Sequence, residues 1–137
     1  MSMTKPAAIY DALATYLAQV DTGSPALPIS FPEPVETFVP PADGRYLDAS
    51  HFNNTPAWVG LNRSKIDQGI FLVTVVWPKN DGLIRPMSVA GLVEAHFATA
   101  PALVSNGHRV KPGVPFVASA VVEPDSVRIP VTIPWTA

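Results

Sequence analysis

The stretch GIFLVTVVW, residues 69–77, decides the fold because it is the clearest β-strand in the chain. Its residues are mainly β-branched or aromatic, the types that fit a pleated strand. Alternate side chains form two apolar sets, one with Ile70, Leu72 and Val76 and the other with Phe71, Val73, Val75 and Trp77. Because both faces are apolar, we expect helices to cover one face and a folded-over loop or another subunit to cover the second.

Amphipathic helices are predicted on both sides of this strand in the sequence. Residues 6–20 place apolar side chains at the spacing of one helical face, and these are Ile9, Leu13, Tyr16, Leu17 and Val20. Residues 86–99 carry a similar stripe after the turn Asn80-Asp81-Gly82. Gly91 inside this second helix costs about 1 kcal/mol relative to alanine, which is tolerable if another backbone packs close by.

Three further strands are predicted, over residues 45–52, 116–123 and 126–135. The last alternates completely and forms a hairpin with residues 116–123 around a turn at 123–126. Pro130 and Pro134 remove N–H donors from the same edge of this strand, so it can pair well on one side only. We therefore expect it at the rim of the sheet, where proline also discourages open-ended pairing.

The segments between these elements are unusual in composition. Proline accounts for 16 of the 137 residues, about twice the usual share, and many of these prolines lie in residues 24–42, which we expect to be extended and irregular. Residues 53–68 show little periodicity and read as a long loop. Loops of that length inside compact domains are usually functional or disordered. The whole chain, residues 1–137, is predicted to form one domain.

Charge and composition exclude several classes of function. The 9 Lys and Arg against 11 Asp and Glu give a net charge of −2, which leaves no basic surface for nucleic-acid binding. Charged residues make up 15% of the chain, against about a quarter in ordinary domains. Because cysteine is absent, disulfides and thiolate metal sites are excluded. No apolar run approaches the roughly 20 residues of a membrane-spanning helix, and residues 1–6 do not read as a signal peptide.

The sequence contains no catalytic motif. His51, His96 and His108 share no ligand spacing. We expect His96 to have a packing or capping role and the other two histidines to be surface or loop residues. The serines lack a Gly-x-Ser-x-Gly turn, and no glycine-rich phosphate loop is found. The carboxylate pairs at 33 and 36 and at 123 and 125 read as solvated turn residues. We therefore expect no enzymatic activity, no cofactor and no bound metal.

The predicted loop carries a candidate contact patch formed by Trp58, Arg63, Lys65 and Asp67. Tryptophan and arginine dominate the energetics of protein interfaces, and loops often carry function. The alternative is an ordinary polar loop with Trp58 packed onto the domain.

The order of elements resembles that of the tail terminator proteins of long-tailed bacteriophages and gene transfer agents. The resemblance covers about residues 5–135 and includes a leading helix and a C-terminal hairpin. The short segments that carry it are ISFP at 29–32, FVPP at 38–41, RYL at 45–47, GIFLVTVV at 69–76, Asp81-Gly82 and AHF at 95–97. Together with the elements above, it implies an α+β (α/β) fold whose mixed, mostly antiparallel sheet of four to five strands is backed by two helices.

The resemblance also implies a function. Six copies would form a ring on the last disc of the tail tube, stop its polymerisation and present a surface to the head connector. The partners would be other copies, the major tail tube protein and head–tail connector or neck proteins. DNA would only pass through the lumen, and no membrane would be involved. The ring would be assembled in the host cytoplasm and would lie at the head-proximal end of the tail of the virion.

Two alternatives remain open at this point. One is a head–tail connector or neck protein, or a tail tube subunit, which the order of elements does not separate from a terminator. The other is a small ligand-binding module or hydrolase that uses Glu33, His51 or His108. That second alternative requires a concave pocket with perturbed titrating groups.

Overall fold

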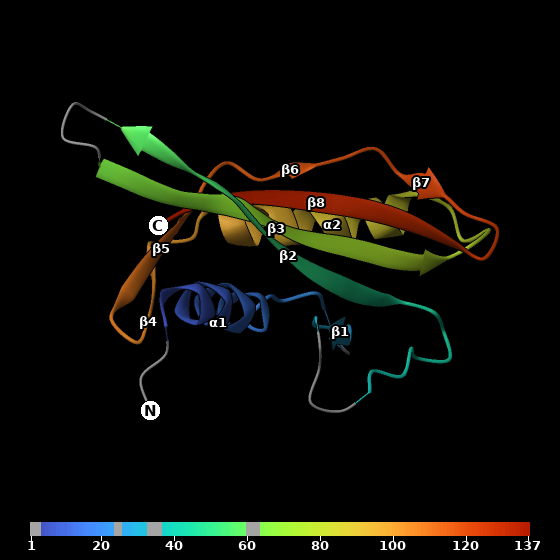
Figure 1. Ribbon diagram of the computed structural model, residues 1–137. Helices are drawn as coiled ribbons and strands as arrows, with labels where there is room; N and C mark the ends of the chain where they lie inside the picture. The colour runs from blue at the N-terminus through green and yellow to red at the C-terminus, as the bar shows by residue number, and fades with distance from the viewer. Residues whose placement is uncertain (1–3, 24–25, 33–36, 60–63) are drawn as a thin grey trace.

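The computed structural model describes residues 4–23, 26–32, 37–59 and 64–137, although the side chains of residues 57–59 and 64 are not described. Two helices and eight strands follow one another along the chain (Figure 1). In order they are α1 (Lys5–Leu17), β1 (Ile29–Ser30), β2 (Tyr46–Val59), β3 (Ser64–Pro78), α2 (Ile84–Ala98), β4 (Leu103–Ser105), β5 (His108–Pro112), β6 (Phe116–Val117), β7 (Val121–Val122) and β8 (Ser126–Thr136).

The sheet is mixed and mostly antiparallel, and its spatial order is β1-β2-β3-β8-β5-β4. β3 lies at its centre, with β2 antiparallel on one side and β8 antiparallel on the other. Only β1 runs parallel to its neighbour, β2. The α+β class is therefore confirmed. The strand number exceeds the expected four to five because residues 103–122 contribute four short strands rather than one continuous strand.

Both helices pack against the same face of the sheet, the face that carries Phe71. Phe97 of α2 lies 6.2 Å from Phe71 between ring centroids, and Tyr10 of α1 lies 5.4 Å from the neighbouring His51. The apolar core between the layers includes the side chains of Leu13, Leu17, Leu47, Phe71, Val73, Val75, Trp77, Val93, Phe97, Ile129, Val131 and Ile133. The helix stripes and the strand alternation read from the sequence thus meet in one core.

A reciprocal contact joins the two helices. The Tyr16 hydroxyl donates a hydrogen bond to the His96 carbonyl at 2.7 Å, and His96 Nε2 lies 2.7 Å from the Tyr16 carbonyl oxygen. The two rings stack with their centroids 4.0 Å apart. The packing role predicted for His96 is confirmed.

The second face of the sheet is not covered by a helix within the described residues. On this face Ile70 and Leu72 are half-buried, and Phe52, which pairs with Ile70, is 51% exposed. Of the apolar residues predicted for the second face of β3, only Val76 is fully buried. One apolar face of β3 is therefore buried within the subunit, and the other face is only partly covered.

The expectation of a long loop at residues 53–68 is wrong, because β2 and β3 continue through it as a hairpin. Their pairing runs from Tyr46 opposite Val76 to Val59 opposite Ser64, with one irregularity between Asn54 and Ala57. The β8 ladder ends at Gln68, so the last part of the hairpin has only two strands (Figure 1). We call residues 55–59 and 64–66 the hairpin arm, with Asp67 at its base. With no third strand, the arm has no core face to impose an alternating pattern on its sequence.

The backbone groups of the two prolines of β8 point away from β3, as predicted. The Pro130 carbonyl accepts a hydrogen bond from Ala118 N–H at 2.8 Å, and the Pro134 carbonyl accepts one from Gly113 N–H at 2.6 Å. Regular pairing on one side only is confirmed. The position at the rim is wrong, because β5, β6 and β7 pair with the other side of β8 in short pieces. The proline carbonyls still accept hydrogen bonds, which is enough to hold these pieces.

His51 lies in β2 rather than in a loop as expected, and it is half-buried against aromatic side chains of the core. Its ring stacks on Trp135 with a centroid distance of 5.6 Å, and Tyr10 and Phe71 also contact it. Both ring nitrogens are buried without a well-aligned hydrogen bond among the described residues. Burial lowers the pKa of His51 below its ordinary value, because the charged imidazolium loses its hydration there, and the nearby Asn53 side chain partly opposes this shift.

Gly69, which is tightly packed, and Gly91, which faces open space, should respond oppositely to substitution by alanine. A Cβ at Gly69 would collide with the Phe52 carbonyl oxygen and lie 2.5 Å from Trp135 Cζ2, whereas a Cβ at Gly91 meets nothing within 4 Å. No close neighbour within the described residues therefore compensates for Gly91 in the helix. Gly69→Ala should lower the free energy of unfolding by about 1–3 kcal/mol, and Gly91→Ala should raise it by about 1 kcal/mol. Urea unfolding of both variants measures the difference, and equal effects would contradict it.

The burial of His51 should make stability depend on pH near the ordinary histidine pKa of about 6.5. The unfolded chain takes up a proton there that folded His51 resists, so stability should fall as the pH falls through that value. Thermal melting from about pH 8 to about pH 5 measures this. His51→Phe keeps a ring beside Trp135 and removes the titration, so its melting temperature should vary less. Identical pH profiles for the two proteins would exclude His51 as the cause.

Candidate functional site

The structure places three residues of the predicted contact patch, Trp58, Lys65 and Asp67, on the hairpin arm or at its base. Trp58 of β2 and Lys65 of β3 are paired opposite one another, and Asp67 lies two residues further along β3. Arg63 lies outside the described residues. The patch therefore belongs to a strand pair rather than to a loop, and Lys65 is exposed on it.

Asp67 is held inside the subunit. Its carboxylate accepts a hydrogen bond from Lys5 Nζ at 2.7 Å, and Lys65 Nζ lies 3.9 Å away. Its backbone pairs with Ala137 in both directions, at 3.0 and 2.8 Å. The hydrogen bond from Lys5 lowers the pKa of Asp67, and partial burial opposes this. Asp67 thus joins α1, β3 and the residue after β8, and it is a structural anchor at the base of the arm.

A cavity of about 420 Å³ lies at the base of the arm, between α1 and the strands. It is lined by Lys5, Pro6, Ile9, Asn53, Asn54, Pro56, Lys65, Asp67, Gln68 and Trp135. Its charged groups are Lys5, Lys65 and Asp67, and both lysines are ion-paired with the one Asp67 carboxylate. Neither His51 nor His108 lines it. The cavity does not provide the converging acid and base that the hydrolase alternative requires.

The remaining features of that alternative are equally unsupported. Glu33 lies outside the described residues, His51 is half-buried against Trp135, and His108 begins β5. Among the described residues no group of three or more His, Asp or Glu side chains is arranged to hold a metal ion. No described helix is long and apolar enough to cross a membrane.

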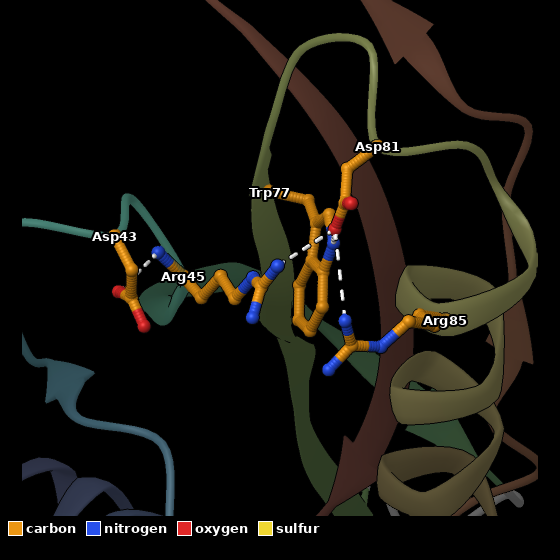
Figure 2. Close-up of polar contacts among 5 residues, drawn as sticks. All are labelled: Asp43, Arg45, Trp77, Asp81 and Arg85. Atoms are coloured by element: carbon orange, nitrogen blue, oxygen red, sulfur yellow. Dashed lines mark hydrogen bonds and ion pairs between the residues drawn. The ribbon is translucent and has the colours of Figure 1, made fainter.

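A polar cluster that the sequence did not reveal surrounds Trp77 at the end of β3 (Figure 2). The guanidinium groups of Arg45 and Arg85 lie over the indole ring, 5.0 and 5.7 Å from its centroid. Asp81 accepts a hydrogen bond from Trp77 Nε1 at 2.7 Å and pairs with Arg45 at 2.9 Å and Arg85 at 4.0 Å. We call these four residues the Trp77 clamp.

The Trp77 clamp fixes a corner of the fold. It joins the start of β2, the end of β3, the predicted turn at residues 80–82 and the first turn of α2, while Asp43 bonds the Arg45 backbone N–H at 3.1 Å. The hydrogen bond from Trp77, with both arginines, lowers the pKa of Asp81, so its carboxylate stays charged at neutral pH. Cations over an indole face are attracted by the ring quadrupole. Both arginines share the one Asp81 carboxylate, so the contacts hold this corner together. Arg45, Trp77 and Arg85 also line a cavity of about 450 Å³.

The outer face of α2 is an uncharged surface. Ile84 is 83% exposed, and Met87 and Leu92 are about half exposed. Small residues continue the same face at helical spacing, namely Ser88, Gly91, Ala95 and Ala98. Arg85 and Glu94, the charged residues of the helix, fall outside this spacing. A smooth, uncharged helix face is unusual where water is the neighbour.

Two further uncharged stretches lie at opposite margins of the sheet. Residues 112–122 contain no Asp, Glu, Lys or Arg and include the exposed Val114, Phe116, Val121 and Val122. Residues 49–59 of β2 also contain none of these charged types. The shortage of charged residues in the composition is therefore greatest on particular surfaces. Interface cores are depleted of charged residues in the same way.

Comparison with known proteins agrees with this architecture. A solved structure of unstated function superposes with a TM-score of 0.70 at 24% identity, covering 96% of this chain and 91% of that chain. A chain from the virion of a native gene transfer agent particle superposes with a TM-score of 0.56 at 18% identity, covering 95% and 91%. At these identities the two likenesses show a shared fold.

The family assignment comes from the sequence itself. No curated protein sequence matches the chain. The sequence profile of the family described as phage tail terminator protein matches residues 8–135, which is nearly the whole chain. The protein therefore belongs to the phage tail terminator family, a family of tail structural proteins and not of enzymes.

Proposed function

We propose that the protein is a tail terminator that acts as a homo-oligomeric ring, with six copies, at the head-proximal end of a phage-type tail. The ring caps the tail tube, ends its polymerisation and forms the surface to which the head connector binds. The observation that carries this proposal is the family match over residues 8–135. The shared fold with a chain from a gene transfer agent virion supports it.

The surfaces of the subunit suit association with copies of itself. The outer face of α2, flanked by Arg85 and Glu94, and residues 112–122, which contain no Lys, Arg, Asp or Glu, both carry exposed apolar side chains. A contact between two different surfaces of identical copies either closes into a ring or grows into a filament. On the far side of β8 the sheet continues only in short pieces, β5, β6 and β7, because Pro130 and Pro134 lack N–H donors there.

The cap then works by geometry. One face of the ring matches the end of the tube, and the other face does not template a further tube disc. No chemical step is needed, and DNA only passes through the lumen. The same subunit on a neck ring would make the same contacts between copies, so the position in the particle distinguishes a terminator from a connector or a tube subunit.

The hairpin arm carries the contact with the neighbouring ring in this proposal. It extends beyond the three-stranded part of the sheet and presents Trp58 and Lys65 on paired positions, with Arg63 between them in sequence. A two-stranded ribbon is marginally stable alone, so a partner that packs on the arm would stabilise it. Asp67 contributes by fixing the base of the arm to Lys5.

The position in the particle is the first test. Gold labelling of a tagged copy in purified particles should place the label at one end of each tail, next to the head, because a cap is present once per tube. Electron microscopy counts the labels. Label along the whole tail would indicate a tube subunit, and unlabelled tails would remove the protein from the tail altogether.

The arm is tested by Trp58→Ala combined with Arg63→Ala. Truncation of interface Trp and Arg residues commonly costs about 2 kcal/mol or more, so binding to tail tubes should weaken at least about tenfold while the melting temperature stays near that of the wild type. Val104→Ala with Arg109→Ala is the matched control, because these exposed residues are paired on the other hairpin, β4–β5. Equal binding of both double variants in tube pelleting would count against a role of the arm.

A further inference from the structure

Within the described residues, the outer edge of β2 has no strand partner along most of its length. β1 covers only Leu47 and Asp48, and the Leu47 N–H donates to the Pro28 carbonyl at 2.9 Å. Backbone groups alternate in direction along a strand, so those of His51 and Asn53 point to the same edge as those of Leu47. No hydrogen bond within the described residues joins these outward groups of His51 and Asn53 to another segment. Residues 52–55 are exposed.

This edge lacks the usual protection. Natural edge strands are blocked by charged side chains, prolines, bulges or very short length. Residues 49–55 contain no Asp, Glu, Lys, Arg or Pro, and the irregularity of β2 begins only after Asn54. The opposite margin of the main ladder is treated differently, because Pro130 and Pro134 interrupt the donors of β8 there. An unprotected edge of this length indicates a strand that pairs with another chain.

The chain itself supplies a matching segment at the other margin of the sheet. Residues 116–122, which include β6 and β7, lie on the far side of β8 from β2 and β3. Their inner backbone groups bind β8, as the bond from Ala118 N–H to the Pro130 carbonyl shows. By alternation, the backbone of Val117 points outward. Val122 is 64% exposed, Phe116 is 54% exposed, and the segment carries no charge.

We propose that the open edge of β2, residues 49–55, pairs with residues 116–122 of a second copy, so that the sheet continues from one subunit to the next. Main-chain hydrogen bonds would provide affinity in such strand addition, and the uncharged side chains on both sides would avoid burying unpaired charge. The two segments lie at opposite margins of one sheet, so the contact is head-to-tail and every copy has one free margin of each kind. The inference rests on the proposed ring in its choice of a second copy as partner.

Cross-linking tests the pairing directly, because the chain has no cysteine. Asn53→Cys is mixed with Val122→Cys or with Phe116→Cys, and a short bismaleimide is added to the purified full-length proteins. The expected product is a mixed dimer from at least one combination, and a variant with both cysteines should give a ladder of higher oligomers. Val104→Cys, at an exposed position on β4, is the control partner. Mixed dimers no more abundant than with this control would overturn the proposal.

The backbone itself is tested by Asn53→Pro against Asn53→Ala. Both substitutions remove the asparagine side chain, but only proline also removes the outward backbone N–H. Sedimentation velocity should show that Asn53→Ala assembles like the wild type and that Asn53→Pro stays monomeric, with both melting alike. Equal assembly of the two variants would overturn the proposal. If Asn53→Pro fails to fold, the cross-linking experiment decides alone.

The outcomes separate this pairing from the cap. Tails labelled only at the head end, without cross-links between Asn53→Cys and either partner, would leave the cap in place and remove the strand pairing. Specific mixed dimers with label along the whole tail would retain the pairing and remove the cap. Cross-links between two copies of Asn53→Cys alone would indicate a two-fold contact and overturn the head-to-tail arrangement.

Discussion

The burial of one face of β3 is the constraint on which the rest of the subunit depends. Phe71, Val73, Val75 and Trp77 are each at most 3% exposed, and both helices and both neighbouring strands are placed to cover them. Burying apolar surface at about 25 cal/mol per Å² makes such a face the main source of stability in a small domain. The opposite face of the same strand has no comparable cover among the described residues, which leaves it available to another molecule.

Much of this arrangement follows from local patterns. The apolar stripes of the helices and the alternation of residues 69–77 and 126–135 have the period of their own element, so they are readable without knowing the fold. The absent donors of Pro130 and Pro134 likewise act through their own strand. Helix α1 ends at Leu17 rather than at Val20 because Gln19 and Val20 N–H bond three residues back, to Tyr16 and Leu17.

The features missed by the sequence depend on contacts between distant segments. The arm lacks a core face, so its strands show no alternation that could be read. His51 is buried by rings contributed by α1, β3 and β8, and the Trp77 clamp unites residues from β3, the turn after it, α2 and the segment before β2. The sequence places Asp67 close to Lys65, but its closest ion-pair partner is Lys5, near the start of the described chain. The spacing of residues along the sequence does not reveal such partners.

The Trp77 clamp and the Tyr16–His96 contact have a consequence for assembly. Together they join β2, β3, α1 and α2 through short polar bonds, so the margins of the subunit are held in a fixed mutual orientation. In a closed ring the number of copies is set by the wedge angle between the two surfaces that touch. Stoichiometry in the proposed cap is therefore encoded in the rigid body of the monomer, and the arm is left free to vary with whatever it must reach.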